Sequence, residues 1–273
     1  MGMVDVAVRM PAQTRRAFLA IVAGPALAGL LPGCGDRKER WQQPGDRDDP
    51  DAALAARPGA PTEPFVRPGT HALGLAEERD ALLHVPPGLQ AGRAVPLVIT
   101  LHGAGGRAEG GLALLRSEAD ERGLLLLAPA SRRTTWDAIR GGYGPDVRLI
   151  DRALEKVFRV VAVDSARIAV AGFSDGASYA LGLGLANGTL CSRVVAFSPG
   201  FVPEARRDGT PRIFVSHGTT DEVLPIERTS RRIVPALRSG GLDVTYREFP
   251  GSHTVPPEIA GEAVDWLDWG RPR

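Results

Sequence analysis

The sequence predicts an α/β fold: a mostly parallel, doubly wound sheet with helices on both faces. Two observations support this prediction. Short apolar runs, which are typical of strands buried on both faces, recur throughout residues 64–273. Segments with the i, i+3, i+4 spacing of helices lie between these runs, and such alternation favours a parallel sheet. No internal repeat and no insertion large enough for a second domain interrupts the alternation.

Each expected element follows from a local pattern. The run 94–103 is predominantly apolar and ends in glycine, as a buried parallel strand does, and 124–130 has the same apolar character. The segment 111–123 has helical spacing and ends in glycine, and 145–164 places its apolar residues on one helical face. Further strands are expected at 79–86, 167–174, 193–200, 211–218 and 243–251, and further helices at 175–188, 227–241 and 256–269.

Composition and charge are those of an ordinary globular protein. The 273 residues are 43% hydrophobic and 24% charged, and 33 basic against 32 acidic residues give a net charge of +1. This balance does not indicate a nucleic-acid-binding protein, which needs basic residues clustered on one face. Two cysteines are too few for a disulfide framework. We expect one of them, Cys191, to be a small buried hydrophobic residue.

Residues 1–34 have the pattern of a bacterial export signal. Arg15 and Arg16 precede an apolar run over residues 17–31, which is short for a membrane span of about 20 residues. The arginine pair resembles a twin-arginine signal, and a start at Met10 would bring it closer to the N-terminus. The segment that ends at Cys34 resembles a lipobox, in which the cysteine becomes lipidated. We therefore expect an exported protein, either periplasmic or tethered to the membrane as a lipoprotein through Cys34.

The next segment, residues 35–63, is rich in Pro, Gly, Asp and Arg and has few apolar anchors. Such a composition buries too little apolar surface to offset the entropy of ordering. We expect a disordered linker here, followed by a single domain over residues 64–273.

The stretch GFSDGAS, residues 172–178, places Ser174 between two glycines. Glycine has no Cβ, so Gly172 and Gly176 permit the crowding of a very sharp turn. The turn joins a predicted strand to a predicted helix, which is the setting that the G-x-S-x-G pattern requires for an exposed nucleophilic serine. The pattern therefore predicts that Ser174 is a nucleophile.

A serine hydroxyl needs a base, and the base needs a group that orients it. In this type of fold the acid and then the histidine follow the serine along the chain. Asp221 and His253 each lie in a loop just past a predicted strand, at the same sheet edge as Ser174. We expect Asp221 to accept the Nδ1 proton of His253, which leaves Nε2 free to take the proton of Ser174.

Other titratable residues fit these roles less well. His217 lies at a strand end directly before a glycine, and we interpret it as a brace for the acid loop. Asp208 and Asp243 stand at the starts of strands, on the wrong edge, and Glu222 is expected to point away from the site. His102 is expected to support its loop by hydrogen bonding and not to act as the base.

The same chemistry needs two hydrogen-bond donors for an oxyanion. One should be the backbone N–H of Asp175, the residue after the serine. The other should come from the glycine-rich stretch 101–106, which follows an early strand. The N–H of Ala104 is the first candidate there, and that of Gly105 is the second.

The motifs LHGAGG, GFSDGAS, HGTTDEVLP and GSH occur in this order and span nearly the whole of residues 64–273. Together they resemble the α/β-hydrolase superfamily. The resemblance is to its small serine esterases, the phospholipase/carboxylesterase, dienelactone-hydrolase or polyhydroxybutyrate-depolymerase-like group. It implies an α/β-hydrolase fold, here without a separate cap domain, with Ser174 as nucleophile, Asp221 as acid and His253 as base. It implies no cofactor and no metal.

The expected activity is hydrolysis of a carboxylic ester, small or polymeric, through an acyl-enzyme. Two alternatives stay open: a catalytically inert ligand-binding lipoprotein, and acyl transfer on a thioester or peptide, because one constellation of residues serves all these reactions. Gly105, Trp136 and Tyr143 are candidates for lining a substrate pocket. Packed loop aromatics are an equal interpretation of Trp136 and Tyr143.

Overall fold

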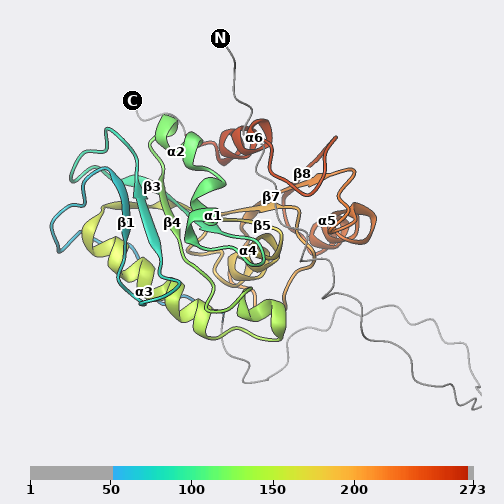
Figure 1. Cartoon of the computed structure of the whole chain (residues 1–273), viewed down its shortest axis with the longest axis horizontal. Helices are drawn as coiled ribbons and strands as arrows, with labels where there is room; N and C mark the ends of the chain where they lie inside the picture. Colours follow the sequence, from blue (N-terminus) through green and yellow to red (C-terminus); the bar gives the residue numbers. More distant parts are fainter. Residues whose placement is uncertain (1–51, 270–273) are drawn as a thin grey trace, which may run out of the picture. The chain divides into compact units, whose positions relative to one another are not determined.

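The computed structural model describes residues 52–269 and contains one eight-stranded sheet in the order β1-β2-β4-β3-β5-β6-β7-β8 (Figure 1). The strands are β1 (Gly69–Ala72), β2 (Leu82–Val85), β3 (Val95–Leu101), β4 (Leu125–Ala128), β5 (Val163–Phe173), β6 (Arg193–Phe197), β7 (Arg212–Gly218) and β8 (Val244–Phe249). The α-helices are α1 (Ala108–Ala113), α2 (Arg116–Arg122), α3 (Pro145–Val160), α4 (Asp175–Ala186), α5 (Ser230–Ser239) and α6 (Pro257–Leu267).

The sheet is parallel from β4 through β3, β5, β6 and β7 to β8, and only β1 and β2 join it antiparallel. The predicted mostly parallel sheet is confirmed. Because the six parallel strands share a direction, the loops that follow them gather at one edge. The segment of β1 was not predicted as a strand, since its four residues GTHA carry little apolar signal.

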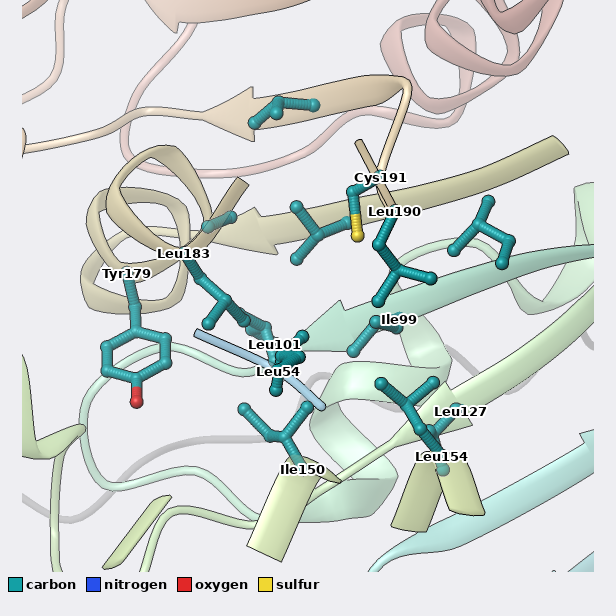
Figure 2. Packing of buried hydrophobic residues seen from close by; sticks show 14 of the residues in the cluster. Leu54, Ile99, Leu101, Leu127, Ile150, Leu154, Tyr179, Leu183, Leu190 and Cys191 are labelled. Carbon is teal, nitrogen blue, oxygen red and sulfur yellow. The ribbon is translucent and has the colours of Figure 1, made fainter. Parts of the chain in front are cut away.

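Helices cover both faces, as predicted. Alternate residues of β3 face opposite ways: Leu97 and Ile99 pack in a cluster with α3, α4 and α5, whereas Val98 packs in a second cluster with α1, α2 and α6. In Figure 1, α2 and α6 lie on one side of the sheet and α3 on the other. Figure 2 shows part of the first cluster, including Cys191. Cys191 is fully buried, which confirms that it is a core residue.

The predicted helix at 111–123 is two short helices. Leu115 leaves the helical conformation, with φ −138° and ψ 15°, and separates α1 from α2. Gly111 lies so close to β3 that a Cβ there would come within 2.6 Å of the carbonyl oxygen of Thr100. The close packing of α1 on the sheet and the break at Leu115 are tertiary effects, which the spacing of apolar residues does not reveal.

The predicted linker, residues 35–63, is wrong for residues 52–63, which pack on the domain. Ala52, Leu54 and Ala56 are buried in the first core cluster, and Figure 2 shows Leu54 among the other labelled core residues. Asn187 holds this segment: its Oδ1 accepts from Leu54 N at 2.7 Å and its Nδ2 donates to Ala52 O at 2.8 Å. The oxygen Oδ1 of Asp151 accepts from the amides of Ala55 and Ala56. Composition missed the segment because three small apolar side chains at every second position suffice to anchor it.

The predicted export signal and the lipidation site Cys34 lie outside the described residues. Within residues 52–269, none of the helices is long and apolar enough to cross a membrane.

Candidate active site

The serine of the glycine-bracketed stretch sits on a strained turn between β5 and α4. Ser174 has φ 57° and ψ −120°, a region that non-glycine residues seldom adopt. A Cβ on Gly172 would lie 2.1 Å from the carbonyl oxygen of Gly176, and one on Gly176 would lie 2.3 Å from that of Leu101. Both positions therefore require glycine for the steric reason that the sequence suggested. The amide of Ser174 donates to Phe197 O at 2.9 Å and fixes the turn to β6.

The three predicted side chains meet at the carboxyl edge of the sheet. Ser174 Oγ lies 2.9 Å from His253 Nε2, and His253 Nδ1 lies 2.6 Å from Asp221 Oδ2. Ser174 follows β5, Asp221 follows β7 and His253 follows β8, so three separate loops bring these atoms within hydrogen-bonding distance. The ring of Phe173 packs on His253, with centroids 4.6 Å apart, and helps to hold the imidazole in place.

The carboxylate of Asp221 is fully buried and held on both oxygens. Oδ1 accepts hydrogen bonds from the amides of Val223 and Leu224 at 2.9 and 2.8 Å, and Oδ2 accepts one from His253 Nδ1. A buried charge needs such partners to offset its desolvation. These bonds also fix the direction of the oxygen that faces His253.

His217 braces the acid loop, as predicted. It is fully buried; Nε2 lies 2.8 Å from Leu224 O and 3.2 Å from Asp221 Oδ2, while Nδ1 lies 2.7 Å from Ser230 Oγ. Because Nε2 faces only acceptors, it must carry the proton, and Nδ1 then accepts from the Ser230 hydroxyl. Desolvation by burial lowers the pKa of His217 below 6.5, which favours this neutral form.

The rival acids lie elsewhere. Asp208 accepts from Thr189 Oγ1 at 2.5 Å, Asp243 pairs with Arg212 at 2.8 Å, and Glu222 is exposed.

Two backbone amides near Ser174 are free to bind an oxyanion. Within the described residues, the N–H groups of Ala104 and Asp175 have no hydrogen-bond acceptor, and Asp175 is the first residue of α4. The N–H of Gly105, the second candidate, instead donates to Thr134 O at 2.6 Å. The geometry therefore favours Ala104 over Gly105 as the donor from this loop.

His102 supports this loop and is not placed to act as a base. Its Nδ1–H donates to Gly103 O at 2.7 Å, and its Nε2 accepts from Ser131 N at 3.0 Å. Desolvation by burial lowers its pKa, which keeps the ring neutral and this tautomer in place.

Trp136 and Tyr143 are packed aromatics, and the suggestion that they line a pocket is wrong. Trp136 is fully buried; its Nε1–H donates to His102 O at 2.9 Å and its ring lies 5.0 Å from that of Tyr179. Tyr143 is 6% exposed and also packs against Tyr179, with ring centroids 5.5 Å apart. The backbone partner satisfies the N–H of the buried Trp136, whereas the buried hydroxyl of Tyr143 has no hydrogen-bond partner within the described residues. Gly105, the third pocket candidate, is exposed on the loop surface.

Ser178, which lies near Ser174, was not identified from the sequence. Ser178 Oγ lies 3.3 Å from Ser174 O and accepts from Gly200 N at 2.9 Å, so it links α4 to the loop after β6. Its position four residues after Ser174, on the same helical face, is the signal that could have found it. Within residues 52–269 no group of three His, Cys, Asp or Glu side chains is arranged to hold a metal ion.

Comparisons with known proteins agree with this architecture. The family model for phospholipase/carboxylesterase matches residues 147–268. Among solved structures, TT1662 from Thermus thermophilus is 25% identical with a TM-score of 0.54, covering 74% of this chain and 98% of that one. Esterase PE8 is 23% identical with a TM-score of 0.52, covering 66% and 95%. The carbohydrate esterase from gut microbiota is 14% identical with a TM-score of 0.60, covering 77% and 98%, and so shows likeness of fold. A comparison with curated proteins gives no match.

The matched segment contains β5, the serine turn, the acid loop and His253, so it includes every side chain of the candidate triad. The likeness to these solved structures extends over 66–77% of the chain. The chain therefore has the α/β-hydrolase fold, and its residues 147–268 match the family model for phospholipase/carboxylesterase.

Proposed function

We propose that the protein hydrolyses carboxylic esters through an acyl-enzyme formed on Ser174. The observation that carries the proposal is the continuous hydrogen-bonded chain from Ser174 Oγ through His253 to Asp221. His253 Nδ1–H donates to the buried carboxylate, so the lone pair of Nε2 points at the serine hydroxyl.

In the first half of the reaction, Ser174 Oγ bonds to the ester carbonyl carbon while its proton passes to His253 Nε2. The carbonyl electron pair moves onto oxygen, and the amides of Ala104 and Asp175 donate to that oxyanion. When the oxyanion collapses, the bond to the alcohol oxygen breaks and the alcohol takes the proton from His253. Water then repeats these steps on the acyl-enzyme and releases the acid.

An apolar shelf supports a substrate with an apolar acyl or alkyl group. Among the described residues, the large hydrophobic side chains that are exposed are Phe201 and Val223, at 42% and 65%. Phe201 lies in the loop after β6 and Val223 in the acid loop, both at the carboxyl edge that holds Ser174. Leu224 packs against Gly200, so the two loops are neighbours. We define Phe201, Val223 and Leu224 as the apolar shelf.

The proposal is tested with p-nitrophenyl esters of rising chain length. Ser174→Ala should reduce kcat/KM by about 10⁴-fold or more, since the nucleophile is lost. Fluorophosphonate should label the wild-type serine and leave Ser174→Ala unlabelled. Labelling without ester turnover would favour thioester or peptide cleavage over ester hydrolysis, and absence of both would favour an inert binding protein.

The shelf is tested separately. Val223→Asp should raise KM for hexanoate esters by about tenfold, which corresponds to about 1.4 kcal/mol of lost apolar binding, and should leave acetate esters nearly unchanged. The exposed neighbour Glu222→Gln serves as the matched control. An equal effect of Val223→Asp on both esters would remove the shelf from the proposal.

We further propose that the protein is exported and lipidated at Cys34. The arginine pair and the lipobox-like end of residues 1–34 support this. In a bacterial host, metabolic labelling with an alkyne fatty acid should mark the full chain and not its Cys34→Ser variant. Equal labelling of the two would exclude lipidation at this residue.

A further inference from the structure

The two amides assigned to the oxyanion in the proposed function come from different elements. Ala104 belongs to the loop after β3, and Asp175 begins α4. Donors must lie about 2.7–3.1 Å from the oxyanion to stabilise it. Neither element by itself fixes the distance between these two amides.

A third segment, residues 131–136, contacts both donor elements, and we refer to it as the strap. The carbonyl oxygen of Thr134 accepts from Gly105 N at 2.6 Å, directly beside Ala104. The hydroxyl of Thr135 donates to Asp175 Oδ2 at 2.5 Å. Consecutive residues therefore hold the two sides of the oxyanion site.

The strap is itself held at its ends. Ser131 N donates to His102 Nε2 at 3.0 Å, and Trp136 Nε1 donates to His102 O at 2.9 Å. Asp146 then accepts from the amides of Arg132 and Asp137 at 2.6 and 2.8 Å. Ser131 and Trp136 are fully buried, whereas Thr135 is partly buried, so the middle of the strap rests on fixed ends.

The bond from Thr135 also has an electrostatic consequence. The carboxylate of Asp175 stands one residue after the nucleophile, and a negative charge close to an oxyanion opposes its formation. A short O–H···O⁻ bond is among the stronger hydrogen bonds in proteins. It directs Oδ2 of Asp175 toward the strap and partly screens the carboxylate charge that would repel the oxyanion.

Resting on the proposed esterase function, we propose that Thr135 is a positioning residue for the oxyanion site, which acts by holding Asp175 and its amide against the strap. Its hydroxyl donates to Asp175 Oδ2, so it is proposed to act through Asp175 and not on the reacting atoms. Its loss should therefore weaken binding of the transition state and leave binding of the ground-state ester unaffected.

The test compares three variants on p-nitrophenyl butyrate. Thr135→Val preserves shape and removes the hydroxyl, and Thr135→Ser restores the hydroxyl. Thr189→Val is the matched control, because it removes an equally short Thr–Asp hydrogen bond, from Thr189 Oγ1 to Asp208 Oδ2, beyond the far end of α4. We expect Thr135→Val to lower kcat about tenfold to hundredfold, less than the 10²–10³-fold cost of deleting a direct donor, with KM unchanged. Thr135→Ser should recover to within about threefold, and Thr189→Val should stay within about twofold of wild type.

A second readout isolates the oxyanion. A trifluoromethyl ketone adds to Ser174 Oγ and forms a hemiketal oxyanion, so its inhibition constant should rise with Thr135→Val by the same factor as kcat falls. In an Asp175→Ala background, Thr135→Val should have no further effect, because its partner is gone.

Several results would overturn the proposal: an unchanged kcat in Thr135→Val, a loss confined to KM, or a loss of the same size in Thr135→Ser. If Thr135→Val does not fold, the same readouts on Thr135→Ala decide the matter. Failure of the esterase assignment is distinguishable, because the wild type itself would then show no ester turnover, with or without fluorophosphonate labelling.

Discussion

Leu54 offers the sharpest test of whether residues 52–63 belong to the domain. Its side chain is 2% exposed and lies in the same cluster as Leu101, Ile150 and Leu183. Leu54→Ala removes three carbon groups at about 0.8 kcal/mol each, or about 2.4 kcal/mol of transfer free energy. A cavity term adds to this, and buried Leu→Ala changes cost about 2.7–5.0 kcal/mol in all.

The assay is urea unfolding of the full chain and its variant, monitored by tryptophan fluorescence. In thermal unfolding, a domain of this size loses about 2–4 °C in Tm per kcal/mol, so a loss of about 3 kcal/mol lowers Tm by about 6–12 °C. Val223→Ala is the control, because that side chain is 65% exposed and its change should stay within about 0.5 kcal/mol.

Truncation gives an independent measurement. A chain that begins at residue 64 loses the burial of Ala52, Leu54 and Ala56 together with the bonds to Asn187 and Asp151, and should be less stable than one that begins at residue 51. If Leu54→Ala and the truncation both leave the free energy of unfolding unchanged within about 0.5 kcal/mol, the segment is not part of the folded unit and the reasoning is wrong.

Three further predictions follow from the buried groups. Gly172→Ala should displace the serine turn and abolish fluorophosphonate labelling, because its Cβ would lie 2.1 Å from Gly176 O; normal labelling would contradict this. Burial lowers the pKa values of His102 and His217 below 6.5 in the folded protein, so the unfolded chain binds more protons below that pH. The stability that both residues contribute above pH 6.5 should therefore decline as the pH falls through their lowered values. Urea titrations from pH 8 to 5 should show this decline, less steeply in His217→Gln; an identical slope in the variant would exclude His217 as a source. Burial raises the pKa of Cys191 to about 12, so in a Cys34→Ser chain a thiol reagent should react with Cys191 only after unfolding.

One buried carboxylate works against this pH dependence. Burial raises the pKa of Asp146 to about 6, so its folded form binds a proton more readily than its unfolded form and stability rises slightly as the pH falls from about 6 toward 3.8. The contribution of Asp146 to the pH dependence of stability is opposite in sign to that of the two histidines. Urea titrations of Asp146→Asn measure the histidine contribution alone.

The sequence predicted the alternation of strands and helices because the central strands are buried on both faces and are apolar throughout. It also indicated the serine turn, since the glycine requirement at 172 and 176 is steric and local. The roles of Ser174, Asp221 and His253 stay predictions, although the structure places the three together.

What the sequence missed depends on contacts between distant residues. The segment around Leu54 is anchored by Asn187, 133 positions away, and no local pattern reports such a bond. The sequence left two interpretations of Trp136 open, a pocket residue or a packed one. Its hydrogen bond to His102 O, 34 positions away, cannot be inferred from the residues around Trp136. The link from Thr135 to Asp175 likewise joins residues 40 positions apart.

The bonds to Asn187 also determine where on the domain residue 52 lies. Helix α4 starts beside Ser174 and runs for 12 residues, about 18 Å at 1.5 Å per residue, before it reaches Asn187. Ala52, the first residue that the structure describes, is bonded to that far end. The contacts of residues 52–56 with α4 are thus made at the end of that helix remote from the edge where Ser174, Asp221 and His253 meet.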